Sequence, residues 1–253
     1  AWAIGGALVL AEGAPRTLAQ ALEAAARRSQ VSGQGLTTIV DGQPRHRSYA
    51  ELLADARGLS GALQAQGLRS GDRLVLQLPV LADHFTAFWA CVLGGITPVT
   101  VAPPPSYDQP GALLDKLINA WRLLGRPAVL TQASRRSPLR EAVSRAGTGG
   151  MRILGFEELQ PEAPAVTHEG GPEDLVFFQL TSGSTGIPKV VPETNRAVLH
   201  HAFAAAAFNR YGPEDISVNW LPLDHVVPTL TSHLRDVVLG AGPVEAFFGQ
   251  TAL

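Results

Sequence analysis

The sequence predicts an α/β fold built from two helix-flanked, largely parallel sheets, the second of them incomplete. Segments with apolar residues at helical spacing alternate with short apolar segments that are typical of buried strands. Strand–helix–strand units in series favour a parallel sheet covered by helices. Residues 157–174, rich in Glu, Pro and Gly, interrupt this alternation before a new apolar segment begins at Leu175.

The first clear element is a helix that follows Ser48. Ser48 and Glu51 fit a capping box, in which the serine hydroxyl and the glutamate carboxylate each satisfy a free backbone N–H group. Apolar residues then recur at helical spacing, and Gly67 is suited to end the helix. The next segment, Arg73 to Pro79, has the apolar content of a strand buried on both faces.

The alternation continues as far as residue 154. We predict an apolar helix over Leu81 to Leu93 and an amphipathic helix over Leu113 to Leu124. Ser137 and Pro138 suit the N-cap and first position of a further helix that ends at Gly147. Short strands are predicted between these helices, over Thr97–Val101, Pro127–Thr131 and Met151–Leu154.

These patterns divide the chain. We expect residues 1–156 to form a first α/β subdomain, residues 157–174 a connection, and residues 175–253 the start of a second α/β subdomain whose remainder is absent. About Thr17 to Gly155 should form the first sheet, and Leu175 should begin the second. The apolar beginning, Ala1 to Leu10, is too short to span a bilayer. The chain starts without methionine, and we expect it to be a piece of a longer protein.

Composition excludes several functional classes. The chain has 253 residues, 45% of them hydrophobic and 17% charged, with a formal net charge of −2. We therefore expect a cytoplasmic globular protein without a nucleic-acid or membrane partner. Its single cysteine, Cys91, excludes an internal disulfide and lies in an apolar run that favours a buried side chain. His200 and His201 are adjacent on a predicted helix and cannot jointly bind a metal, so no metal site is expected in this chain.

One segment carries most of the chemical information. It joins two predicted strands and concentrates hydroxyls, glycines and a lysine in one loop. Glycines let the backbone approach a polyanion, hydroxyls donate to phosphate oxygens, and lysine adds a positive charge. This composition suits a nucleoside triphosphate. The segment reads Thr181, Ser182, Gly183, Ser184, Thr185, Gly186, Ile187, Pro188, Lys189.

Two other interpretations of this loop are a Walker-type P-loop and a hairpin without a ligand. A Walker-type P-loop requires Gly-Lys-Ser/Thr at the start of a helix, whereas here Pro188 precedes Lys189 and the chain continues as a strand. The Walker interpretation therefore fails on both spacing and context. A Ser/Gly-rich hairpin that binds no ligand is the second alternative, and the residues of the loop alone leave it open.

The loop resembles the phosphate-binding signature of the superfamily of acyl- and aryl-CoA ligases, luciferases and nonribosomal-peptide adenylation domains. Further segments resemble the same superfamily, so the likeness covers nearly the whole chain. Within the superfamily, the chain is most similar to the acyl-AMP ligase domains of polyketide and mixed polyketide–peptide synthases. The segments that carry the wider likeness are Ser48 to Leu52, Gly71 to Leu74, Pro98 to Gln132 and Asn219 to Asp236.

The resemblance implies an enzyme that uses ATP to activate a carboxylic acid as an acyl-adenylate. Lys189 and His225 are then the candidate catalytic residues, and His225 would line the acyl pocket. The implied phosphate-binding set is Thr181, Ser182, Gly183, Ser184, Thr185, Gly186 and Lys189.

Some positions depart from this pattern or have a simpler explanation. The family usually has glycine after the lysine, where this chain has Val190. His225 could instead pack near a strand end, and Asp224 is expected to cap the following helix. Amino-acid-activating relatives place an aspartate at a position that corresponds to Val226, so we expect a fatty or other non-amino acid.

The resemblance also implies the partners. The acyl group would pass to the pantetheine thiol of a carrier protein or to CoA. ATP and Mg²⁺ are the implied cofactors, with Mg²⁺ bound mainly by residues absent from this chain: family members carry, further downstream, a Mg²⁺-binding glutamate, a ribose-binding aspartate and a mobile domain with a catalytic lysine. We therefore expect these 253 residues alone to be inactive. The alternative function is that of a truncated, non-catalytic relative that binds a nucleotide or a partner.

Overall fold

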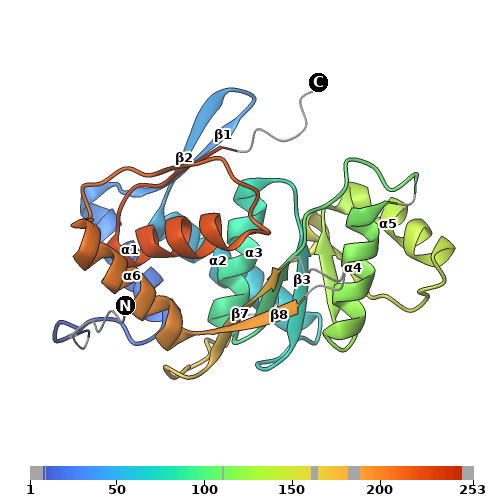
Figure 1. Cartoon of the computed structure of the whole chain (residues 1–253), viewed down its shortest axis with the longest axis horizontal. Coiled ribbons are helices and arrows are strands. Elements are labelled where there is room, and N and C mark those ends of the chain that lie inside the picture. The colour runs from blue at the N-terminus through green and yellow to red at the C-terminus, as the bar shows by residue number, and fades with distance from the viewer. Residues whose placement is uncertain (1–7, 9, 110, 161–164, 182–188, 247–253) are drawn as a thin grey trace, which may run out of the picture.

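The computed structural model describes residues 8, 10–109, 111–160, 165–181 and 189–246. A six-stranded sheet forms its centre, in the order β6-β5-β3-β4-β7-β8 (Figure 1). The first five of these strands run parallel, and β8 runs antiparallel to β7. The strands are β3 (Arg73–Gln77), β4 (Thr97–Thr100), β5 (Ala128–Thr131), β6 (Ile153–Gly155), β7 (Leu175–Thr181) and β8 (Lys189–Thr194).

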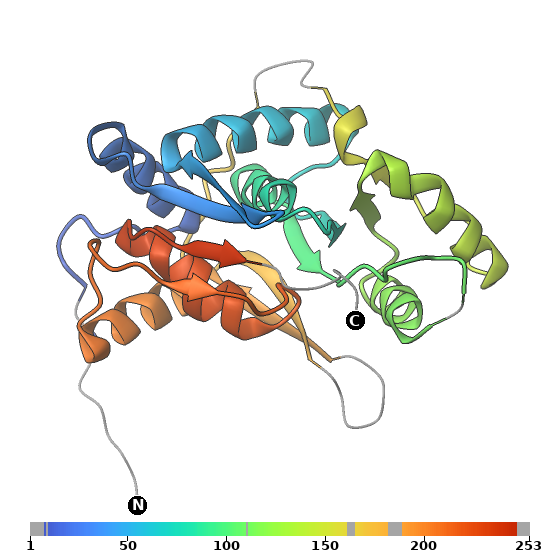
Figure 2. The ribbon, with the colours of Figure 1, turned by 90° about the horizontal axis from the view of Figure 1, so that it is seen from above.

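A second sheet has four strands in the order β2-β1-β10-β9. Its antiparallel hairpin, β1 (Gly35–Val40) and β2 (Gln43–Ser48), comes from the beginning of the chain. The two parallel strands, β9 (Val218–Asn219) and β10 (Val244–Ala246), come from its end. Figure 2 shows these blue and red strands side by side. The expected α/β class, with two largely parallel sheets flanked by helices, is confirmed.

The pairing of the strands corrects one expectation. Leu175 does not begin a second sheet, because β7 pairs in parallel with β4, with Val99 opposite Phe178. The second sheet instead begins with β1, which the sequence patterns did not reveal. The physical reason is burial on both faces: Phe177 packs in the core on one side of β7 and Phe178 in the core on the other, so β7 needs a central place. The boundary at residues 157–174 stays a prediction.

Helices cover both faces of the first sheet (Figure 1). On one face α2 (Tyr49–Ala65) and α3 (Leu81–Gly94) pack against Leu74 and Leu76 of β3. On the other face α4 (Ala112–Leu123) and α5 (Ala133–Arg145) pack against Val75. The alternation of side chains along β3 thus divides the interior into two cores. The remaining helices, near the second sheet, are α1 (Leu18–Ser32), α6 (Asn195–Asn209), the π-helix η2 (Val227–Leu234) and α7 (Arg235–Leu239).

Helix ends show where local sequence was a reliable guide. The predicted capping box of α2 is present, with Ser48 and Glu51 bonded reciprocally. The predicted start of α5 is wrong, because the helix begins at Ala133 and contains Pro138. The Ala133 N–H group donates to the Glu157 carboxylate at 2.6 Å. Glu157, in the short 3₁₀ turn η1 (Phe156–Glu158), therefore caps the helix from a distant part of the sequence.

Two further expectations concern the burial of Cys91 and the suitability of the helices for spanning a membrane. Cys91 is fully buried, and burial raises the pKa of its thiol well above the usual value, which fits an unreactive core residue. Among the described residues, no helix has the length and apolar character needed to cross a membrane.

Candidate active site

The hairpin of β7 and β8 holds the ends of the predicted phosphate loop. Thr181 and Lys189 are paired across the hairpin, and both side chains are exposed. The structure therefore brings the first and last of the predicted phosphate-binding residues together. The five between them, Ser182, Gly183, Ser184, Thr185 and Gly186, lie outside the described residues.

The hairpin lies at the edge where the parallel strands end. Val99 of β4 is opposite Phe178 of β7. From this pair, β4 ends one residue later at Thr100, and β7 ends three residues later at Thr181. In open α/β sheets, ligands bind in the crevice beyond the carboxyl ends of the strands. The base of the predicted phosphate loop lies at this edge of the sheet.

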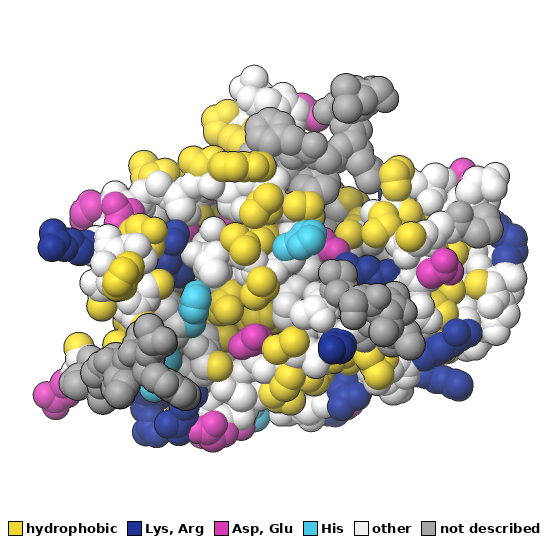
Figure 3. Space-filling view, in the orientation of Figure 1, with side chains coloured by type: hydrophobic (Ala, Val, Ile, Leu, Met, Phe, Trp, Pro, Cys, Tyr) yellow, Lys and Arg dark blue, Asp and Glu magenta, His cyan; other side chains and the backbone are white. Residues whose placement is uncertain are grey.

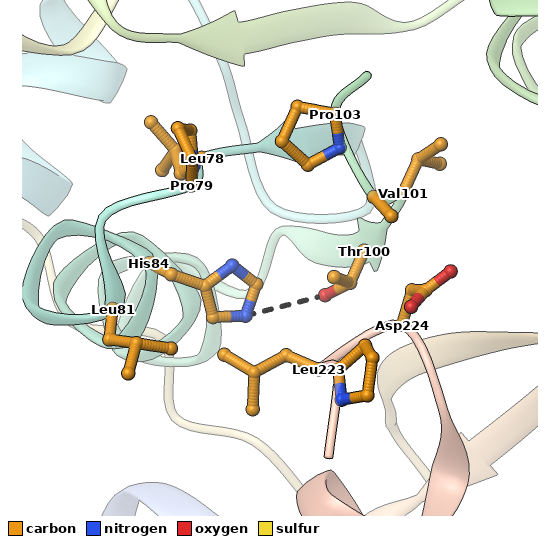
Figure 4. Close-up of a pocket in the computed structure, with 11 residues that line it drawn as sticks. Leu78, Pro79, Leu81, His84, Thr100, Val101, Pro103, Leu223 and Asp224 are labelled. Carbon is orange, nitrogen blue, oxygen red and sulfur yellow. Dashed lines mark hydrogen bonds between the residues drawn. The ribbon is translucent and has the colours of Figure 1, made fainter. Parts of the chain in front are cut away.

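A cavity of about 110 Å³ opens at the same edge (Figure 4). The segments that follow β3 and β4 supply walls that include Leu78, Pro79 and Val101. The turn at residues 222–224, which follows β9, supplies the opposite wall. Most of the lining is apolar, with a few polar groups among it, and this mixture is typical of sites for small organic molecules.

His84 is a polar lining residue that the sequence analysis missed. It comes from the first turn of α3 and is buried, and its Nε2 lies 3.5 Å from Thr100 Oγ1 (Figure 4). Burial lowers the pKa of His84 to about 4, against the opposing influence of Asp224, so the imidazole is neutral near pH 7. Its place in the first turn of the helix that follows β3 was the available signal.

Asp224 is the carboxylate of the cavity, and it is already paired. Lys116 Nζ of α4 donates to Asp224 Oδ2 at 2.7 Å. The backbone carbonyl of Asp224 accepts a 2.8 Å hydrogen bond from Gln179 of β7. The expectation that Asp224 caps the following helix is wrong, because its carboxylate turns toward α4 and η2 has no side-chain cap. Gln179 thus connects the cavity wall to the strand that carries the phosphate loop.

His225 lies next to the cavity wall, in the turn that follows residues 222–224. Its backbone N–H group bonds Pro222 in a tight turn, and its side chain is exposed beside the wall at residues 222–224. His84, not His225, supplies the imidazole that lines the cavity described above. The assignment of His225 to an acyl pocket stays a prediction.

The described residues fit part of a nucleotide site. The exposed ammonium of Lys189 and hydroxyl of Thr181 suit phosphate oxygens.

The described residues contain no group of three or more His, Cys, Asp or Glu placed to hold a metal ion. His200 and His201 are both exposed. Figure 3 shows the face of the molecule that is seen in Figure 1. Lys and Arg side chains lie mainly toward the edges of this face, and hydrophobic side chains lie near its centre.

Comparisons with known proteins agree with this architecture. The chain is 30% identical to the inactive atromentin synthetase invA6 of Paxillus involutus, over 81% of this chain and 21% of that protein. It superposes on McyG A-PCP complexed with phenylalanyl-adenylate with a TM-score of 0.89 and 29% identity, over 97% of this chain and 44% of that one. An adenylation domain of a keto acid-selecting NRPS module, bound to keto acyl adenylate, gives a TM-score of 0.84 and 35% identity over 93% and 42%.

The chain thus spans about a fifth of the fungal relative and less than half of the two solved chains. The model of the AMP-binding enzyme family matches residues 22–242, which include the six-stranded sheet, strands β1, β2 and β9 of the second sheet, the predicted phosphate-loop segment and the cavity walls. On this match the chain belongs to the family of AMP-binding enzymes, and its fold is that of adenylation domains.

Proposed function

We propose that this chain forms part of an enzyme that activates a carboxylic acid with ATP as an acyl-adenylate, for transfer to a carrier-protein pantetheine thiol or to CoA. One observation carries the proposal: Thr181 and Lys189 hold the ends of the loop at the same sheet edge as an apolar cavity. The proposed triphosphate site and the proposed acid site would thus share one edge of the sheet.

The reaction requires little covalent chemistry from the protein. A carboxylate oxygen of the acid forms a bond to the α-phosphorus of ATP, the bond from that phosphorus to the bridging β-phosphate oxygen breaks, and pyrophosphate leaves. Acceleration then comes from positioning and from cations that neutralise developing charge. Lys189 would supply one such cation, and Thr181 a hydrogen-bond donor. Bound Mg²⁺ would add further neutralisation of the phosphates.

The cavity favours an acid without an α-amino group. Its carboxylate, Asp224, is neutralised by Lys116, and its imidazole, His84, is uncharged near pH 7. Among the described lining residues, none therefore offers an unpaired negative charge to a substrate ammonium group. This supports a fatty or other non-amino acid, and the keto acyl adenylate bound to one similar domain is consistent with that class.

The acceptor follows from the chemistry of the product. An acyl-adenylate reacts with a thiol, because sulfur attacks the carbonyl carbon and AMP leaves. The A-PCP form of one similar structure supports a carrier protein as the source of that thiol. CoA offers the same thiol, so assays with each acceptor separate the two.

A second candidate is a relative that binds a nucleotide or a partner without catalysis. Val190, which departs from the usual glycine, is the observation that favours it. In the structure Val190 is half-buried and packs against the core beneath α4 and α5, so its side chain has a packing role. The strand position of Val190 thus accommodates a side chain beside the loop.

ATP–pyrophosphate exchange tests the proposal. The complete enzyme should exchange with acids that lack an α-amino group and prefer them to matched amino acids, such as phenylpyruvate over phenylalanine. Residues 1–253 alone should show no exchange above background, because the proposed activity needs the residues that relatives carry downstream. Nucleotide binding without exchange for any acid in the complete protein would favour the second candidate. Robust exchange by residues 1–253 would contradict the requirement for downstream residues.

A further inference from the structure

Two polar side chains meet in the wall of the apolar cavity. His84 comes from the first turn of α3, and Thr100 is the last residue of β4. Both line the cavity, and His84 Nε2 lies 3.5 Å from Thr100 Oγ1 in a long hydrogen bond (Figure 4). Among the described residues, neither side chain has a second hydrogen-bond partner. The pair therefore has hydrogen-bonding capacity that this one bond does not use.

The two side chains together carry one more hydrogen-bond donor than they use. Burial lowers the pKa of His84 to about 4, so near pH 7 the ring is neutral and has one N–H group and one bare nitrogen. Thr100 adds one O–H group. The bond between the two side chains uses one of these hydrogens, whichever ring nitrogen is protonated. One N–H or O–H group is therefore left in either tautomer, and two are left if the long bond opens.

The remaining donor faces the cavity. Figure 4 shows the second ring nitrogen of His84 on the side turned away from Thr100, toward the space that Pro103 borders. Asp224, the carboxylate of the lining, already accepts from Lys116, and the described contacts give it no hydrogen bond to either side chain of the pair. Most other lining side chains are apolar. An unpaired donor in such a wall is unfavourable, so the pair is suited to a ligand that brings an acceptor.

The place of the donor in the sheet indicates which part of an acid it would meet. Strand β4 lies between β3 and β7. Beyond β3, Leu78 and Pro79 form an apolar wall, and β7 ends in Thr181 at the base of the predicted phosphate loop. Thr100 therefore lies between the apolar wall and that base. An acid whose carboxylate points toward ATP would bring the atoms next to its carboxylate to the donor and the rest of its chain to the apolar wall.

We propose that His84 and Thr100 are specificity-determining residues: the donor that the pair leaves free binds a carbonyl oxygen on the α-carbon of the acid, so that the site selects α-keto acids. This inference rests on the proposed function and narrows its class of acids. A carbonyl oxygen only accepts, so it matches a single donor. An acid with a CH₂ group in the same place leaves that donor unpaired, and an α-ammonium group brings more donors instead of an acceptor.

ATP–pyrophosphate exchange by the complete enzyme tests the selection with acids that differ only at the α-carbon. The matched pairs are phenylpyruvate with hydrocinnamate and α-ketoisocaproate with isocaproate. In each pair that the enzyme uses, kcat/KM should be higher for the keto acid by about tenfold or more, because a site built to bind an oxygen discriminates against the analogue that lacks it. A ratio within about twofold of one in the wild type would overturn the proposal without any variant. A higher kcat/KM for phenyllactate than for phenylpyruvate would also overturn it, because the selected oxygen would then be a hydroxyl.

Variants assign the selection to the two residues. The double variant His84→Leu with Thr100→Val removes both donors, and its ratio for a matched pair should fall to within about twofold of one. Thr131→Val is the matched control: Thr131 ends β5, its hydroxyl bonds the Gln77 carbonyl outside the cavity, and its loss should leave the ratio as in the wild type. A wild-type ratio in the folded double variant would overturn the assignment. If the double variant does not fold, each single variant should lower the ratio, because the bond between the two side chains orients the remaining donor; an unchanged ratio in both would overturn the assignment equally.

Failure of the proposed function gives a different result from failure of this inference. Absence of exchange with every acid in the wild type would count against the proposed function itself. Exchange with equal kcat/KM for the two acids of a pair would leave that function standing and overturn only the selection of α-keto acids.

Discussion

Lys116 on α4 and Asp224 in the turn after β9 form an ion pair of 2.7 Å, which joins a helix of the first sheet to the wall of the cavity. Asp224 is almost fully buried, with 7% of its side chain exposed, whereas Lys116 retains 28%. The pair neutralises the carboxylate where an organic acid would lie. Because Asp224 is neutralised in this way, the same ion pair stabilises the fold and supports the proposed preference for acids without an α-amino group.

Lys116→Met should destabilise the chain, because it leaves a buried carboxylate without its partner. Loss of one partner of a fully buried pair costs about 3–5 kcal/mol, and the partial exposure of Lys116 reduces this to about 1–3 kcal/mol. Asp224→Asn should cost less, because the freed ammonium can reach water. The double variant should be more stable than the sum of the two single changes predicts. Urea unfolding of all four proteins measures this coupling, and strict additivity would mean that the pair contributes nothing.

His84 should make the fold sensitive to acid. Its pKa of about 4 in the folded chain lies below the ordinary value of 6.5, so between these pH values the unfolded chain binds more protons. The stability that the neutral ring contributes is therefore present above pH 6.5 and is lost as pH falls toward 4. The largest slope for one proton is about 1.4 kcal/mol per pH unit.

His84→Gln removes this titration and should reduce, by about one proton, the slope of the free energy of unfolding against pH between 7 and 4.5. The exposed His200 supplies the matched control, because His200→Gln should leave the slope as in the wild type. Urea unfolding at several pH values measures both. A slope in His84→Gln that equals the wild-type slope would show that His84 does not titrate differently in the folded chain.

Glu157→Ala should shorten or fray the start of α5. The Glu157 carboxylate accepts the N–H group of Ala133 and places negative charge at the helix N-terminus. Loss of such a cap costs about 1 kcal/mol. Thermal unfolding gives the global effect and hydrogen exchange of residues 133–137 the local one. Unchanged exchange there would mean that another group caps the helix.

The sequence predicted the elements with strong local signals and missed those that depend on distant contacts. The capping box at Ser48 and Glu51 was identified because both partners lie within one turn. The start of α5 was misplaced because its cap, Glu157, lies beyond the helix and β6. The pairing of β1 with β10 joins residues about two hundred positions apart, and no local periodicity records it.

In the candidate site, too, the feature with a local sequence signal was predicted and the feature built from distant segments was not. The phosphate loop was predicted from its order of hydroxyls, glycines and lysine, and it stays a prediction, although Thr181 and Lys189 at its ends are paired as a hairpin requires. The cavity was not predicted in detail, because its walls come from three separate segments. His84 gave only the signal of a histidine after a strand, and its neutral state depends on burial that appears once the chain has folded.

Lys189→Ala in the complete enzyme tests the central claim most directly, since that claim places ATP phosphates at the β7–β8 hairpin. A charge-assisted contact is worth about 1.5–3 kcal/mol, so kcat/KM for ATP should fall by about ten- to a hundred-and-fifty-fold. The melting temperature should hardly change, because Lys189 is exposed, and Arg57→Ala, at an exposed ion pair on α2, should leave the kinetics unaltered. Wild-type kcat/KM for ATP in Lys189→Ala would contradict the assignment of this hairpin to ATP.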